Sequence, residues 1–148
     1  MGDIIRKVKL CGLSRDGKLQ RDWRRCPEVD ALVDTGATAT VIPRYLAALA
    51  GARVVPGLRH MQRRPYDGAM VALRVEGCPV SPHVAVVSDR LASRAKPAAE
   101  IILGHDYLQD NRVRIDYEDR RPGVTCPPRK PRNGKGGKGN GGNGRQGR

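Results

Sequence analysis

Short apolar runs alternate with polar turns along most of the chain. Apolar residues at every second position, or in short buried runs, predict strands over residues 4–10, 29–33, 39–42, 83–87, 101–103 and 113–117, with strands and a hairpin over 53–75. Pro43 and Gly51 bracket a stretch of helix-forming residues at 44–50, and a second short helix is predicted over 105–110. Many short strands with one or two short helices predict a mainly β domain.

Glycine-containing pairs mark the predicted turns between these strands. Asp16-Gly17 and Gly77-Cys78-Pro79 interrupt the apolar pattern and predict loops. The pair Asp67-Gly68, between Tyr66 and Ala69, predicts a tight hairpin turn, because Asp-Gly readily adopts the positive φ angles that such turns require.

The composition changes sharply after residue 126. Residues 127–148 contain seven Lys and Arg, no acidic residue, and no aliphatic or aromatic side chain. Such a segment cannot bury apolar surface to offset the entropy of ordering, so we predict a folded domain over 1–126 and a disordered Gly/Lys/Arg-rich basic tail over 127–148. Of the formal net charge of +13, residues 1–126 contribute +6. The tail is a candidate for weak, salt-dependent binding of nucleic acid, while a solubilising linker and a remnant of a polyprotein remain open.

The four cysteines, Cys11, Cys26, Cys78 and Cys126, show no metal-ligand spacing, so neither a metal site nor a cofactor is predicted. The N-terminus has charged residues where an export signal needs an apolar core, and no apolar run approaches the length of a membrane span. These features predict a cytoplasmic protein with reduced thiols and no membrane association.

One carboxylate interrupts the apolar pattern at residues 31–43, which read ALVDTGATATVIP. Asp34 lies between two apolar runs, where a charge is costly unless it is paired, hydrogen-bonded or used in chemistry. This segment resembles the active-site segment of retropepsin-like aspartic proteases, in which a strand runs into Asp-Thr/Ser-Gly-Ala, and most closely that of small bacterial single-lobe members. The order of the following elements is also similar over about residues 28–117: a short helix, a hairpin, and an apolar run that ends in glycine at 102–104.

The resemblance implies a single-lobe, closed β-barrel of the acid-protease type, and it implies roles for named residues. Asp34 would act as general acid and base, Thr35 would lock the loop, and Gly36 would let backbone approach the carboxylate and substrate. Ala37 and Thr38 would contact substrate, and Ile102, Leu103 and Gly104 would support the loop from below. The hairpin near Tyr66, Asp67, Gly68 and Met70 would occupy the place of the family's flap and contact substrate.

The chain contains only one Asp-Thr-Gly motif and is too short for two lobes. Peptide hydrolysis by this chemistry needs two carboxyl groups that share a proton. We therefore expect a homodimer in which Asp34 of each copy supplies half of the dyad, acting on a peptide or protein substrate. The alternative is a catalytically weak or inactive dimerisation and binding module of the same fold, with a basic tail that binds polyanions.

Overall fold

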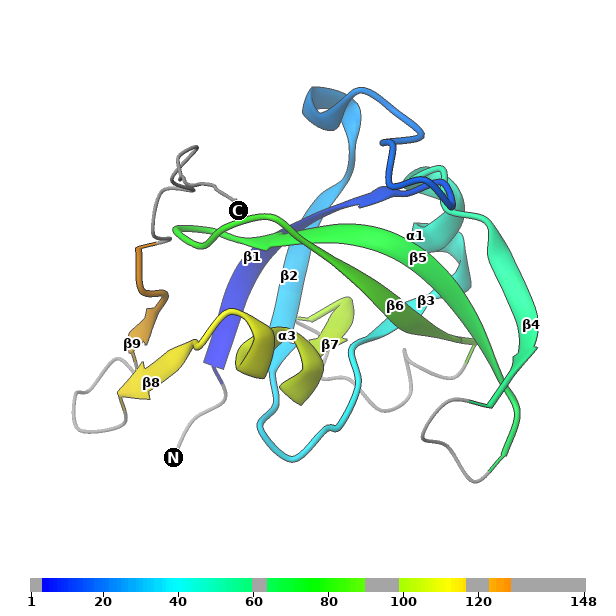
Figure 1. Ribbon diagram of the computed structural model, residues 1–148. Coiled ribbons are helices and arrows are strands. Elements are labelled where there is room, and N and C mark those ends of the chain that lie inside the picture. The colour runs from blue at the N-terminus through cyan, green and yellow to red at the C-terminus, as the bar shows by residue number, and fades with distance from the viewer. Residues whose placement is uncertain (1–3, 60–63, 90–98, 117–122, 129–148) are drawn as a thin grey trace, which may run out of the picture.

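The computed structural model describes residues 4–59, 64–89, 99–116 and 123–128 (Figure 1). In these ranges short strands dominate, with two α-helices, α1 (Arg44–Leu49) and α3 (His105–Asp110), and one 3₁₀ turn, η1 (Trp23–Arg25). The strands are β1 (Ile4–Gly12), β2 (Glu28–Val33), β3 (Val41–Pro43), β4 (Val54–Leu58), β5 (Tyr66–Val75), β6 (Ser81–Ser88), β7 (Ile101–Leu103), β8 (Arg114–Asp116) and β9 (Gly123–Thr125).

Six strands close into a barrel in the order β1-β2-β7-β3-β6-β5, because β5 pairs with β6 on one side and with β1 on the other. β4 extends the sheet as an outer strand on β5, and β8 and β9 form a separate two-stranded ribbon. The prediction of a mainly β, closed-barrel domain with two short helices is therefore confirmed. β9 was not predicted.

The core is built almost entirely from aliphatic side chains, in keeping with a sequence that lacks Phe. Along β5, alternate residues Ala69, Val71, Leu73 and Val75 face the interior and are buried. The largest fully buried side chain is Tyr107 of α3. Its hydroxyl donates to the Pro79 carbonyl at 2.9 Å and accepts from the Val75 amide at 3.2 Å, which satisfies the polar end of the ring within the core.

The predicted turn at Asp67-Gly68 is wrong. Both residues lie inside β5, where Gly68 pairs with Val55 of β4 and with Val86 of β6. Glycine occupies this position for space: a Cβ on Gly68 would lie 2.6 Å from Leu58 Cδ1 and 3.2 Å from Val84 Cγ1. The connection between β4 and β5 falls at residues 59–65, and its centre, residues 60–63, lies outside the described residues.

The prediction of reduced thiols is also wrong, because the structure pairs all four cysteines. Cys11 is bonded to Cys26 across the β1–β2 connection, and Cys78 is bonded to Cys126 beyond β9. The bonded cysteines are 15 and 48 positions apart in the sequence, separations that by themselves indicate no pairing. The crosslinks agree with the limited capacity of a domain of this size to stabilise itself by burial alone.

The sequence also predicts no membrane association and a disordered basic tail. None of the helices in the described ranges is long and apolar enough to cross a membrane. The predicted basic tail, from residue 129 onward, lies outside the described residues.

Candidate active site

Asp34 directly follows β2 and begins a tight loop that leads to β3. Its backbone amide donates to the Leu103 carbonyl at 3.0 Å, and its carbonyl accepts from the Ala37 amide at 3.1 Å. The Gly36 amide donates to the carboxylate oxygen Oδ1 at 2.9 Å. Among the described residues, the second carboxylate oxygen has no hydrogen-bond partner, so Asp34 is held by one oxygen and open at the other.

Ile102 and Leu103, two of the residues predicted to support this loop, belong to β7. β7 pairs in parallel with β2 and in antiparallel with β3, so Ile102 and Leu103 lie between the two strands that flank the loop. The His105 amide donates to the Ala37 carbonyl at 2.7 Å. A Cβ on Gly104 would lie 2.4 Å from both the carbonyl carbon and the oxygen of Ala39, so only glycine fits there without displacing the loop backbone.

Thr40 makes a buried contact with α3 that was not predicted from the sequence. The fully buried Thr40 hydroxyl donates to Asp106 Oδ1 at 2.8 Å and accepts from the Gly104 amide at 3.1 Å. The Thr40 amide donates to Asp106 Oδ2 at 3.2 Å. Asp106 was not among the predicted site residues. A hydroxyl within an apolar strand was the available signal, since a buried hydroxyl needs a partner.

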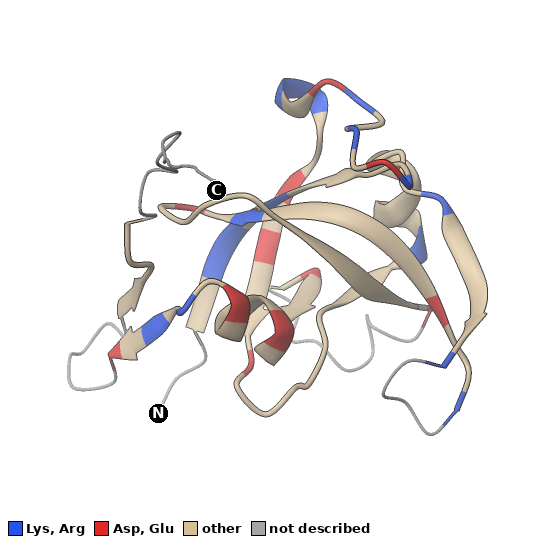
Figure 2. Cartoon of the chain, in the orientation of Figure 1, with Lys and Arg blue, Asp and Glu red and all other residues tan. Residues whose placement is uncertain are grey.

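Thr35 and Thr38 are exposed, unlike Thr40. Within the described part of the chain, the Thr35 hydroxyl makes no hydrogen bond. Thr35 borders a surface hollow of about 310 Å³ whose other lining residues come from α3 and the segment after it: His105, Leu108, Gln109, Arg112, Val113 and Ile115. The loop is therefore anchored from the inside of the barrel, while its first residues face outward. Figure 2 shows acidic residues on α3, beside this loop, and basic residues on η1 at the opposite side of the barrel.

The residues predicted to form a flap divide into two groups. Tyr66 and Asp67 begin β5, and the Asp67 carboxylate accepts from Arg44 Nη2 of α1 at 2.7 Å. Arg44 Nε also donates to Asp89 at 2.9 Å. The hydrogen bond to Asp89 is the largest cause of a raised pKa at Arg44, and the hydrogen bond to Asp67 raises this pKa further. Arg44 therefore ties the first residues of β5 to the end of β6.

Gly68 and Met70 lie further along β5, on the face turned away from the barrel interior. Gly12, at the end of β1, pairs with Val71, the neighbour of Met70, whereas Val33, before Asp34, pairs with Ile4 at the start of β1. The structure therefore does not bring Met70 together with Asp34.

His83 and His105 lie in the described part of the chain, where no candidate metal centre is found. No group of three or more His, Cys, Asp or Glu side chains in the described ranges could hold a metal ion. His83 is buried on β6, with its Nε2 2.7 Å from the Ser81 hydroxyl, which accepts from the side-chain amide Nδ2 of Asn111 at 2.9 Å. Burial lowers the pKa of His83, and the charges of Asp106 and Asp110 oppose this shift. His83 is thus part of a buried polar cluster.

An Asp-Thr-Gly loop at the end of one strand, supported by a second strand and its glycine, defines a site of the aspartic-protease class on this barrel. The family model for the gag-polyprotein putative aspartyl protease matches residues 26–110, and the chain belongs to that family.

Solved structures show a likeness at low sequence identity. The EIAV protease complexed with the inhibitor HBY-793 is 18% identical, with a TM-score of 0.47, covering 74% of this chain and 88% of that one. The retroviral protease-like domain of Ddi1 from Leishmania major is also 18% identical, with a TM-score of 0.46, covering 84% of this chain and 95% of that one. No curated protein sequence matches the chain.

Proposed function

We propose that the protein is an aspartic endopeptidase whose active site forms when two copies bring their Asp34 carboxylates together across a two-fold axis. The observation that carries this proposal is the single Asp-Thr-Gly loop, in which Asp34 has one oxygen held by Gly36 and the other open. A lone carboxylate cannot supply both an acid and a base, whereas two placed about 3 Å apart share one proton and supply both.

The chemistry divides between the two carboxyl groups. The ionised Asp34 takes a proton from a water molecule as the water oxygen attacks the peptide carbonyl carbon, and the protonated Asp34 gives its proton to the carbonyl oxygen. When the tetrahedral species collapses, the Asp34 that took the water proton gives it to the leaving nitrogen, the other Asp34 takes a proton from a hydroxyl of the tetrahedral carbon, and the C–N bond breaks. Gly36 fixes the orientation of its own chain's carboxylate, and the absence of a side chain there leaves room for the substrate backbone.

The dimer is supported by the way each loop is held. The backbone bonds of Asp34 and the Thr40–Asp106 contact fix the loop from inside, which leaves the Thr35 hydroxyl facing outward with no partner in its own chain's described residues. A symmetric interface would place Thr35 near its counterpart in the second copy. The hollow beside Thr35 would lie in or near the same interface.

Mixing wild-type and Asp34→Asn chains tests both the catalytic group and the stoichiometry. The homogeneous variant should lose at least about 10³-fold of its activity on an unfolded protein substrate, while Asp16→Asn, an exposed carboxylate in another loop, should remain active. After equal amounts are unfolded and refolded together, roughly one quarter of the dimers carry two Asp34 residues, so activity per total protein should fall to about that fraction.

Activity that falls only to one half in the mixture would mean that one chain holds a complete site. Hydrolysis unchanged by Asp34→Asn would exclude the mechanism. A dimer with no Asp34-dependent hydrolysis would support the binding module instead. A cytoplasmic location stays a prediction, and the two disulfides are the reason to examine it by thiol titration of freshly isolated protein.

A further inference from the structure

A pocket of about 440 Å³ lies on the outer face of the β4–β5–β6 sheet. Its floor comes from the strands, through Val55, Gly68, Met70 and Val84, and one wall comes from residues 13–20. Met70 and Val84 are opposite each other in register, and their neighbours Val71 and Ala85 face the core. Because side chains alternate along a strand, Met70 and Val84 must face outward. The volume falls within the range of small-molecule sites.

The 13–20 wall of this pocket lies away from Asp34. Val33, the residue before Asp34, pairs with Ile4 at the start of β1, whereas the wall begins just after Gly12 at the other end of this nine-residue strand. At about 3.3 Å per residue, the two ends of β1 are roughly 26 Å apart. A ligand bound against this wall would therefore not contact Asp34.

The floor collects a large share of the exposed apolar side chains. Of seven large hydrophobic residues that are exposed in the described part of the chain, Val55, Met70 and Val84 all line this pocket, with exposed fractions of 41%, 39% and 43%. Scattered single apolar residues are normal on a protein surface, but apolar residues grouped in a hollow indicate a binding site. Gly68 extends the floor, since its missing Cβ leaves room for Leu58 to lie over the strand.

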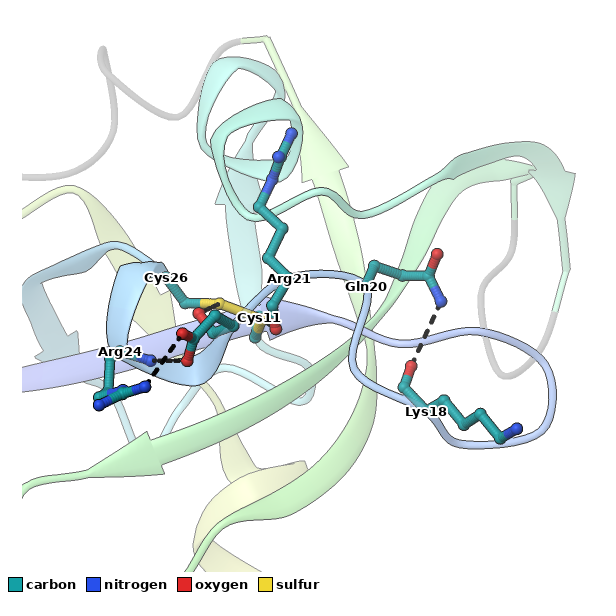
Figure 3. Close-up of a disulfide and its surroundings, with 7 residues drawn as sticks. Cys11, Lys18, Gln20, Arg21, Arg24 and Cys26 are labelled. Carbon is teal, nitrogen blue, oxygen red and sulfur yellow. Dashed lines mark hydrogen bonds and ion pairs between the residues drawn. A yellow bond between two sulfur atoms is a disulfide. The ribbon is translucent and has the colours of Figure 1, made fainter.

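The wall formed by residues 13–20 is preorganised by its own hydrogen bonds. The Leu13 amide donates to the Met70 carbonyl at 2.9 Å, and the Gln20 amide donates to the Gly12 carbonyl at 2.8 Å, which fixes both ends of the segment. Between them, the Ser14 amide donates to the Lys18 carbonyl at 2.9 Å. The Gln20 side chain donates to the same carbonyl at 3.3 Å (Figure 3). A ligand would therefore meet a formed wall and would not have to order a loop.

Among the described residues that line the pocket, two are charged, Arg15 and Arg53, and none is a carboxylate. Both arginines are exposed, and neither forms an ion pair with any described residue. An apolar floor with two unpaired guanidinium groups at its edge is complementary to a molecule with an apolar body and one anionic group.

We propose that this pocket binds a small amphipathic carboxylate, with its apolar chain on Val55, Met70 and Val84 and its carboxylate between Arg15 and Arg53. Both arginines lie on segments that enclose the floor, one in the 13–20 wall and the other just before β4. This inference is independent of the proposed protease activity, because it uses no residue of the Asp34 loop.

The test is an NMR titration of the full chain, with labelled backbone amides and methyl groups, using three ligands with ten-carbon chains, each kept below its solubility limit and any micelle concentration. Decanoate should shift the methyl signals of Met70, Val55 and Val84. Decanol, which has the same chain without the charge, should bind about tenfold more weakly, and decyltrimethylammonium should bind more weakly still.

Paired variants separate the charge from the apolar floor. Arg15→Gln/Arg53→Gln should weaken decanoate binding about tenfold and leave decanol binding unchanged. The matched control Arg24→Gln/Arg25→Gln removes the same charge from η1 and should leave both affinities unchanged. Val84→Asp, at a position that is 43% exposed, should abolish binding of both ligands while amide signals of the core stay in place.

Several results would overturn the proposal. Equal affinity for decanoate and decanol, or equal losses in the two double variants, would show that the arginines do not recognise the carboxylate. Shifts confined to other surfaces would exclude the pocket. Binding of an acidic leucine-containing peptide on these methyl groups without binding of decanoate would assign the surface to a protein segment, and dissociation of a dimer by decanoate would assign it to a second copy of the chain.

Discussion

Two loops at opposite ends of β1 are held in different ways. The loop at 13–27, which joins β1 to β2, is crosslinked by Cys11–Cys26 and contains short-range bonds such as that from the Ser14 hydroxyl to Asp16 at 2.8 Å. The loop at 34–40 depends on partners more than sixty positions away, through Thr40 bonded to Asp106 and to Gly104. The shape of the 13–27 loop is therefore largely local, whereas the geometry of Asp34 depends on the folding of the whole barrel.

Among the substitutions that compare these two loops, removal of the Cys11–Cys26 bond should cause the largest loss of stability. Closure of a 15-residue loop is worth about 3 kcal/mol in the chain-entropy account, so Cys11→Ser/Cys26→Ser should lower the free energy of unfolding by about that amount. Urea unfolding measures the loss. Amide signals of residues 34–40 should not move in the folded variant, and displacement of those signals would show that the two loops are coupled.

Alanine substitutions at Gly104 and Gly17 should differ in their cost to stability. Gly104 is required for space, whereas Gly17 is required for its backbone conformation. Gly104→Ala places a Cβ 2.4 Å from the Ala39 backbone and should cost about 2–3 kcal/mol while shifting the Asp34 loop. Gly17→Ala, in the 13–27 loop, meets open space and should cost only about 1 kcal/mol, from its φ of +80°. Thermal or urea unfolding of the two variants measures the difference, and equal losses would contradict the close approach at Gly104.

Deletion of single hydroxyl groups should cause the smallest losses of stability in these comparisons. The loss should again be larger in the 34–40 loop than in the 13–27 loop. Thr40→Val leaves the buried Gly104 amide without a partner and removes one of the two hydrogen bonds that Asp106 Oδ1 accepts, and should cost about 2 kcal/mol. Ser14→Ala removes bonds to Asp16 and the Lys18 amide at the surface, where water replaces them, and should cost under about 1 kcal/mol. The comparison fails if urea unfolding gives Ser14→Ala the larger loss.

The same contrast explains what the sequence could predict. Strand patterns and the Asp-Thr-Gly motif are local, so β2, β7 and the position of Asp34 at a strand end followed from the residues themselves. The Thr40–Asp106 contact and both disulfides join residues far apart in sequence, and no spacing rule indicates such pairs. Asp67-Gly68 was misjudged because the glycine accommodates Leu58 and Val84 from two neighbouring strands, a need for space that resembles a turn signal when only one strand is considered.

The crosslink at Cys126 changes how a processed form of the protein would behave. Cys126 is the last residue before the basic segment, and its partner Cys78 lies in the turn between β5 and β6. A single backbone cut between these cysteines would leave both fragments, together with the segment at 127–148, in one covalent molecule. Such a nicked chain would keep its mass and migrate as two pieces only after reduction, so the products of any cleavage there would be released by thiols and not by the protease.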